Sequence, residues 1–147
     1  MIFKRTYKYS NEIANHLNEY RDAYPYVSID TSSIIPNEFI VYNIYNHKKY
    51  IGFIILYNDS EVNYEINAFE LIVGIFKKYQ KHRYFKNAVL KLITSKQNLM
   101  PPYILGAIIN KENKRKPFIF NTLLNLGFKN TSSDYNSDYD LVFHSNL

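Results

Sequence analysis

The spacing of apolar and polar residues predicts a chain of alternating strands and helices. Strands show a period of two or a continuous apolar run, whereas helices show apolar residues three and four positions apart. The predicted strands are residues 2–9, 38–45, 50–57, 69–76, 103–109, 127–131 and 139–144, and the predicted helices are residues 10–22, 84–97 and 117–126. The proline-containing segment 22–37 carries no pattern that we can assign to an element.

The order of these elements predicts a mixed sheet. Strand 69–76, helix 84–97 and strand 103–109 form a β-α-β unit, which predicts a right-handed crossover between parallel strands. Strands 38–45 and 50–57 flank a short polar turn and predict an antiparallel hairpin. The expected fold class is therefore α/β with a mixed sheet (α+β). The sheet is expected to be mostly antiparallel, with one central parallel pair and helices on both faces.

Two signals mark the ends of the predicted helices. Ser10 is a suitable N-cap because its hydroxyl can accept from the free amides of the first turn, and Glu12 favours the positive end of the helix dipole. Pro117 suits the first turn of the last helix, and Gly127 suits the position just after its end.

The composition is that of a globular chain. With 147 residues, 46% of them hydrophobic and 21% charged, the chain fits one domain over residues 1–147 and is neither a disordered tail nor a coiled coil. It has no cysteine, which excludes disulfides, thiolate metal sites and a thiol nucleophile. It has no apolar run near the ~20 residues that span a bilayer and no signal-peptide core, so we expect a cytoplasmic protein that does not bind membranes.

Basic residues concentrate in the middle of the chain. The net charge is +5, and residues 77–116 hold eleven of the eighteen basic residues but only one of the thirteen acidic ones. Such a block attracts polyanions, either a phosphorylated cofactor or nucleic acid, or it is simply a solvated lysine-rich surface. The junction at residues 77–84 presents a helix N-terminus, which is a natural site for phosphate.

Two strings carry a family resemblance. In IVGIFKKYQKHRYFKNAVLKLI, Ile75 ends a strand and Gln80 lies in the loop before a helix. In INKENKRKPFIFNTLLNLGFKNT, Asn113 precedes a helix and Leu-Gly-Phe at 126–128 enters the next strand. Together with the element order, which matches over nearly the whole chain, they resemble the GCN5-related N-acetyltransferase (GNAT) family, with its Q/R-x-x-G-x-G/A loop. The resemblance implies an acetyl-CoA cofactor and acetyl transfer to a primary amine.

The resemblance also implies where the cofactor would bind. Strand residues of the family pair with pantetheine, and the loop amides bind the pyrophosphate. The residues implied here are Val73, Gly74, Ile75, Gln80, Lys81, His82, Arg83, Tyr84, Phe85 and Asn113. From the residues alone, Gly74 marks either a bulge or close backbone approach, or else a packing gap. His82 is a second titratable group, and contact with phosphate or solvent is favoured for it over proton transfer.

Three positions depart from the family pattern. Arg83 and Phe85 stand where the loop glycines, or Gly and Ala, would be, and Leu123 stands where the general-acid tyrosine would be. Arg83 can still serve if its backbone is helical and its guanidinium reaches a phosphate, and Phe85 fits as the first core anchor of its helix. These departures allow either a diverged enzyme or an inactive relative.

Glu70 is the candidate general base, and hence the catalytic residue. It is expected to begin its strand, as the base does in the histone-acetylating branch of the family, although its distance to Gln80 is one residue shorter. The alternative is an ordinary strand-end carboxylate. The four histidines show no metal-ligand spacing, so no metal site is expected.

Three functions follow in order of preference. The first is an acetyl-CoA-dependent N-acyltransferase acting on a small-molecule or protein amine. The second is an inactive GNAT-like module that binds a partner or senses CoA. The third, nucleic-acid binding, is disfavoured because the basic block lacks recurring aromatic stacking positions. The sequence does not identify the acceptor, and the resemblance allows a homodimer through the last strands.

Overall fold

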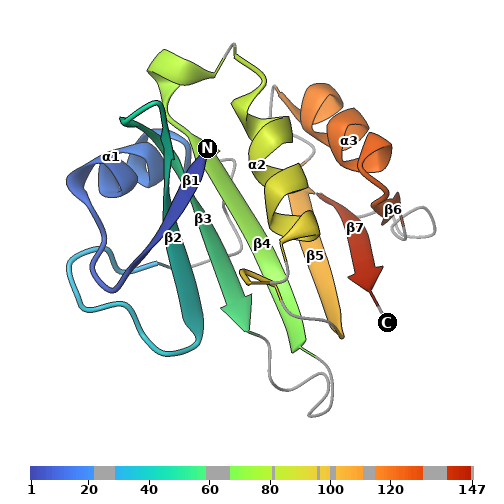
Figure 1. Ribbon diagram of the computed structural model, residues 1–147, viewed down its shortest axis with the longest axis horizontal. Helices are drawn as coiled ribbons and strands as arrows, with labels where there is room; N and C mark the ends of the chain where they lie inside the picture. The colour runs from blue at the N-terminus through green and yellow to red at the C-terminus, as the bar shows by residue number, and fades with distance from the viewer. Residues whose placement is uncertain are drawn as a thin grey trace.

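Seven strands form one twisted mixed sheet in the computed structural model of the chain (Figure 1). The structure describes residues 1–21, 29–58, 67–80, 82–95, 97–99, 102–110, 115–130 and 139–146. The strands are β1 (Ile2–Thr6), β2 (Phe39–Asn46), β3 (Lys49–Asn58), β4 (Asn67–Ile75), β5 (Tyr103–Asn110), β6 (Lys129–Asn130) and β7 (Tyr139–Asn146). The helices are α1 (Asn11–Glu19), the short 3-10 helix η2 (Lys77–Tyr79), α2 (Tyr84–Thr94) and α3 (Lys116–Asn125).

The strand order confirms the predicted fold class. The order in the sheet is β1-β2-β3-β4-β5-β7-β6, and β4 and β5 are the one parallel pair among the described strands. Helix α1 packs on one face of the sheet, whereas α2 and α3 pack on the other. Within the described part of the chain, no helix is long and apolar enough to cross a membrane.

Several elements are shorter than the sequence predicts. The ladder between β1 and β2 ends at Thr6, and Lys8 takes part only in an isolated bridge with Ile34. Helix α2 ends at Thr94, three residues before the predicted end at residue 97, because Ser95 takes an extended backbone conformation. These are differences at element ends, where local pattern is least informative.

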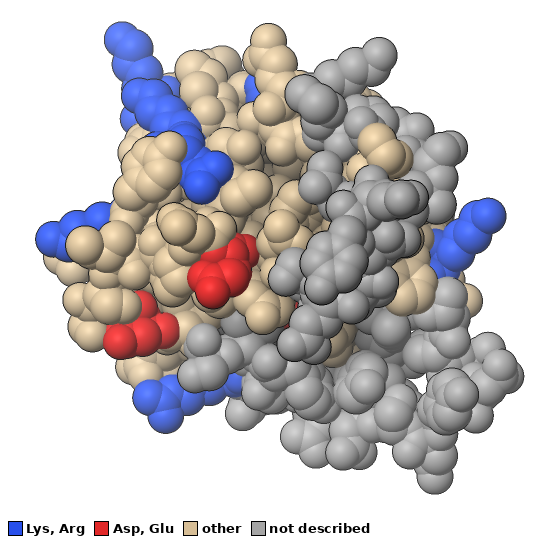
Figure 2. Space-filling model, turned by 90° about the horizontal axis from the view of Figure 1, so that it is seen from below, with Lys and Arg blue, Asp and Glu red and all other residues tan. Residues whose placement is uncertain are grey.

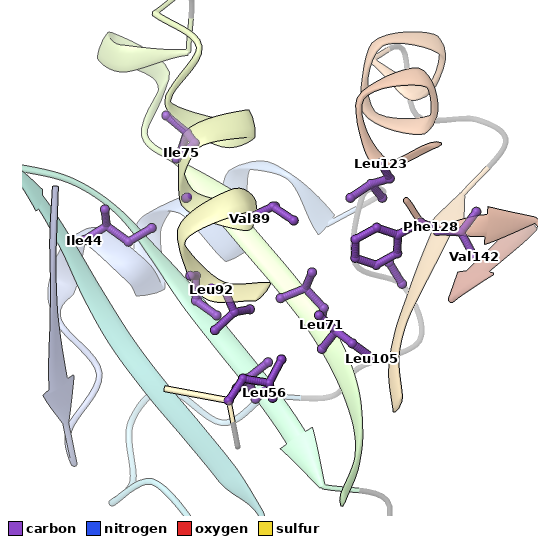
Figure 3. Close-up of a cluster of buried hydrophobic side chains, with 14 of the residues drawn as sticks. Ile44, Leu56, Leu71, Ile75, Val89, Leu92, Leu105, Leu123, Phe128 and Val142 are labelled. Atoms are coloured by element: carbon purple, nitrogen blue, oxygen red, sulfur yellow. The ribbon is translucent and has the colours of Figure 1, made fainter. Parts of the chain in front are cut away.

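The larger core lies between the sheet and helices α2 and α3 (Figure 3). Val89 and Leu92 of α2 point at the sheet, where Leu71 of β4 and Leu105 of β5 meet them. Because β5 is apolar at almost every position, it suits the interior of the sheet.

The smaller core lies under α1. Ile13 of α1, Phe53 of β3 and Ile72 of β4 are its centre, and each is 5% exposed or less. Ser10 caps the helix as predicted: its Oγ accepts from the Ile13 amide at 3.1 Å. The same hydroxyl lies 2.7 Å from Oη of Tyr50, which donates to Asn43 Oδ1 at 2.6 Å. This chain of hydrogen bonds fixes the start of α1 on the β2–β3 hairpin.

A Schellman motif explains the Leu-Gly-Phe string after α3. The amide of Gly127 donates to Leu124 O at 3.1 Å, and the amide of Phe128 donates to Leu123 O at 3.0 Å. Gly127 has φ +97°, so it occupies the left-handed position that glycine adopts most readily. Leu123 and Phe128 are both buried in the larger core, which makes the apolar contact that accompanies this motif.

Candidate active site

The parallel strands β4 and β5 separate halfway along their length. Their ladder joins Asn67–Glu70 with Tyr103–Gly106. Beyond it, β4 stays paired with β3 as far as Ile75, while β5 stays paired with β7 as far as Asn110. The carboxyl ends of the two strands therefore diverge, and the sheet forks after Glu70.

The strand residues predicted to contact the cofactor, Val73, Gly74 and Ile75, lie on β4 beyond this fork. Val73 is half-buried, and Ile75 is buried in the larger core. The β3–β4 register runs unbroken through Gly74, so no bulge lies there against β3. A Cβ on Gly74 would instead fall on the ring of Phe53 and 3.1 Å from Cδ2 of His16. Of the two interpretations of this glycine, the structure favours packing.

Glu70 lies at the fork itself. It pairs with Tyr57 of β3 and with Gly106 of β5, which is the last pair of the parallel ladder. The expectation that Glu70 begins its strand was wrong, because β4 starts three residues earlier at Asn67. Side chains alternate along a strand, and Ile72 belongs to the core under α1. Glu70, two residues before it, is therefore on the same face as α1.

A turn that contains the 3-10 helix η2 leads from the end of β4 toward α2. The amide of Phe76 donates to Ile51 O at 2.9 Å, which holds the start of the turn against β3. Gln80 closes the turn, because its side-chain Nε2 donates back to Ile75 O at 3.0 Å. The same Nε2 lies 3.3 Å from Tyr20 Oη at the end of α1. The sequence placed Gln80 in the cofactor loop but did not indicate this connection to α1.

Helix α2 begins at a residue with a left-handed backbone. Arg83 has φ 59° and ψ 13°, so its backbone is left-handed and the condition of a helical backbone named from the sequence is not met. The residue adopts the conformation that a glycine would take, and its carbonyl still accepts from the Asn87 amide at 3.1 Å. Helix α2 has no side-chain cap and no acidic residue in its first turn. Its first amides and the positive end of its dipole therefore favour an anion at this end of the helix.

The remaining loop residues have different environments. Phe85 packs against the larger core and lies 6.4 Å from the ring of Phe118, so it is the core anchor that the sequence suggested. Tyr84 lies with its Oη 3.4 Å from Asn46 Nδ2, and the exposed His82 ring is 5.5 Å from the Tyr84 ring. Two further predicted site residues, Lys81 and Asn113, lie outside the described residues.

The described basic residues of the central block, residues 77–116, do not all lie on one surface. Lys77 Nζ lies 3.7 Å from Glu19 Oε1, and Lys91 Nζ donates to Met1 O at 2.6 Å at the far side of α2. Figure 2 shows the molecule from below Figure 1, at the end away from the start of α2, and on this face the described lysine and arginine side chains lie mainly around the edge. Arg83 and Lys86 are exposed close to the start of α2. The block therefore places only part of its charge beside the candidate phosphate site.

The structure also places two residues near the site, His16 and Tyr20, that the sequence did not identify as site residues. Tyr20 and His16 lie one helical turn apart with their rings 4.6 Å apart. His16 is 6% exposed and packs edge-on against Phe53 and Phe76, and its burial lowers its pKa to about 4. His16 and Tyr20 lie three and seven positions after Ile13, the spacing of one helix face. For His16 this was the signal that could have placed it beside the buried Ile13. Leu123, at the family's tyrosine position, is 1% exposed.

Comparisons with known proteins give structural neighbours only. No protein-family model matches the chain, and no curated protein matches it. An acetyltransferase from Bacillus subtilis, solved in complex with CoA, is similar over 99% of this chain and 98% of its own, with a TM-score of 0.70 and 13% identity. A variant of the spermidine N-acetyltransferase SpeG from Vibrio cholerae is similar over 99% and 95%, with a TM-score of 0.71 and 12% identity.

A third neighbour extends the comparison to another kingdom. NAA60 from Arabidopsis thaliana, bound to a bisubstrate analogue, is similar over 99% of this chain and 100% of its own, with a TM-score of 0.62 and 11% identity. These identities are too low to carry an activity, but the agreement extends over entire chains. The forked sheet, the central parallel pair and helices on both faces are thus those of the GCN5-related N-acetyltransferase fold, which this chain adopts.

Proposed function

We propose that the protein is an N-acetyltransferase that binds acetyl-CoA and transfers its acetyl group to a primary amine. One observation carries the proposal: β4 separates from β5 after Glu70 and then leads, through a tight turn, into the uncapped start of α2. In this arrangement the part of β4 beyond Glu70 lies outside the parallel ladder, where an elongated ligand can pair with the strand, and the start of α2 that follows offers a phosphate site. The neighbours crystallised with CoA and with a bisubstrate analogue support it.

The residues present fit CoA at this site. The start of α2 is uncapped, has no acidic residue in its first turn and has Arg83 and Lys86 exposed beside it, so it can accept the negative charge of the phosphates. Val73 and Ile75 lie on the part of β4 that has left the parallel ladder. Acetyl-CoA would supply the thioester whose carbonyl the amine attacks.

We assign the general base to Glu70. An ammonium group must lose a proton before its nitrogen can attack a carbonyl, and a carboxylate at the fork can accept that proton. Transfer then forms a C–N bond, breaks the C–S bond and releases the CoA thiolate. Because Leu123 is buried and apolar, no hydroxyl at that position can protonate the thiolate. The thiolate therefore leaves unprotonated, or takes a proton from water or from the amine nitrogen, which must lose one after its attack to give the neutral amide.

A thermal-shift titration tests cofactor binding directly. Acetyl-CoA at a hundred times its Kd adds about 2.7 kcal/mol to the free energy of unfolding. For a chain of this length the expected shift in Tm is roughly 5–12 °C. Dephospho-CoA, which lacks the 3′-phosphate, tests how much of the shift depends on that charge. The proposal is contradicted if neither acetyl-CoA nor CoA shifts Tm at millimolar concentration.

A second assay tests transfer. CoA thiol release is measured with a panel of amines that includes spermidine, small diamines and peptides with a free N-terminus. Glu70→Gln is expected to lower the rate about 10²- to 10⁴-fold, the usual contribution of a general base, with CoA affinity unchanged. Binding of CoA with no thiol release from any amine would instead identify an inactive CoA-binding protein.

A further inference from the structure

Gln80 connects three separate parts of the molecule. Its backbone amide donates to Lys77 O at 3.4 Å within the turn. Its side chain donates to Ile75 O at 3.0 Å, at the end of β4, and to Tyr20 Oη at 3.3 Å, at the end of α1. One residue therefore joins the forked strand, the turn that leads to α2 and a helix on the opposite face of the sheet.

The Tyr20 hydroxyl is held in place by buried groups. Tyr20 is the C-cap residue of α1, and its amide donates to His16 O at 3.0 Å. Its ring packs on the buried His16 ring, which packs edge-on against Phe53 and Phe76 and lies beside Gly74. A hydroxyl held in this way can orient the Gln80 amide, whereas one on a mobile surface chain would contribute little.

We propose that Tyr20 is a positioning residue for the cofactor turn, acting through Gln80. This inference rests on the proposed function, because it assumes that CoA uses the start of α2. The turn from Ile75 to Gln80 sets where α2 begins relative to β4, so a shift in the turn displaces the helix amides from the phosphates. Without the Tyr20 hydroxyl, Gln80 retains its bond to Ile75 but loses the contact that fixes it to α1.

The same connection works in the opposite direction. If α1 favours the CoA-binding position of the turn, CoA must favour the ordered end of α1 by the same factor, because coupling between sites is reciprocal. The chain leaves α1 at Tyr20 and Arg21. Binding of CoA therefore stabilises the hydrogen-bonded end of α1 further, and hydrogen exchange of the Tyr20 amide reports this stabilisation.

The test compares CoA affinity in matched variants by isothermal titration. Tyr20→Phe is expected to weaken CoA binding about two- to tenfold, the range of one net hydrogen bond. Gln80→Met, which loses both side-chain bonds, weakens it further, and adding Tyr20→Phe to it has no additional effect. In the wild type, saturating CoA slows hydrogen exchange at the Tyr20 amide, and Tyr20→Phe abolishes this slowing.

Tyr50→Phe is the control, because it removes hydroxyl bonds to Ser10 and Asn43 at the other end of the same helix. It should lower Tm and leave CoA affinity unchanged, which separates positioning of the turn from general loss of stability. If the wild type binds CoA and Tyr20→Phe binds it equally well, the role of Tyr20 is refuted and the proposed function stands. If the wild type does not bind CoA, both proposals are refuted.

Discussion

Replacing Gly74 with alanine tests whether the end of β4 is set by packing. A Cβ at this position would overlap Cε1 and Cζ of Phe53 and lie 3.1 Å from Cδ2 of His16. Phe53 is fully buried, and His16 is 6% exposed, so neither ring has space into which it can turn. The added methyl must therefore push Phe53 off its preferred rotamer or shift β4 away from β3.

The expected cost follows from the size of this overlap. Inserting a methyl into a filled core typically costs 1–3 kcal/mol, and we expect about 2 kcal/mol because two ring carbons are overlapped at once. At this chain length that corresponds to a loss of roughly 4–10 °C in Tm. The assay is urea unfolding followed by circular dichroism and by the fluorescence of the 15 tyrosines, since the chain has no tryptophan. The midpoint should fall while the m-value stays constant.

Two further variants serve as controls for Gly74→Ala. Gly106→Ala places the same methyl on the neighbouring strand, where the nearest atom, Phe143 Cε1, is 3.4 Å away. It should be close to neutral. Phe53→Leu shortens the overlapped side chain, so Gly74→Ala should cost less in that background than in the wild type. Equal costs for Gly74→Ala and Gly106→Ala would refute the packing argument.

Three other predictions concern stability. Burial lowers the pKa of His16 to about 4, against about 6.5 in the unfolded chain. The free energy of unfolding should therefore be highest above pH 6.5 and fall by up to about 3 kcal/mol as the pH drops to 4. In His16→Leu, the urea midpoint should depend less on pH across this range. Tyr9 buries a hydroxyl without a hydrogen-bond partner in the described structure, so Tyr9→Phe should raise stability by about 1 kcal/mol in the same unfolding assay. Lys48→Gly and Arg83→Gly each place glycine at a position with a left-handed backbone and should raise the free energy of unfolding by up to about 1 kcal/mol, seen as a higher Tm. Alanine at either position should not raise it.

The order of the elements could be predicted because each one is specified by its own short stretch of sequence. Burial of one helix face or one strand face leaves a period that is visible within about ten residues. The Leu-Gly-Phe string was informative for the same reason, since the Schellman motif needs only neighbouring residues: a left-handed Gly127 between Leu123 and Phe128. The parallel β4–β5 pair followed from the helix between the two strands, because a short turn cannot connect parallel strands.

The details of the site depend on contacts that no local pattern records. Gln80 and Tyr20 lie 60 positions apart, and Gly74 is explained by a phenylalanine on another strand. The alternation of β4 could place Glu70 on a face, but only the register with β5 shows that the strands separate at that residue. Prediction of the site therefore stopped at residues adjacent in sequence, such as the turn and the start of α2.

Arg83 shows why a missing motif residue is weak evidence for a missing site. An arginine in place of the glycine of the family pattern suggests that the loop has a different shape, yet Arg83 takes a left-handed conformation, which glycine adopts most readily. For a residue with a Cβ this conformation costs roughly 1–2 kcal/mol. Contacts on both sides of Arg83 oppose that cost, because the Phe76 amide donates to Ile51 O of β3 and Phe85 packs against the larger core. The surrounding structure can therefore impose the backbone geometry that glycine makes easy. What the arginine changes is the side chain beside the helix N-terminus, where a positive charge can compensate a phosphate. Arg83→Gly would restore the family residue and remove that charge, so a gain in Tm together with weaker CoA binding would separate the two effects in one variant.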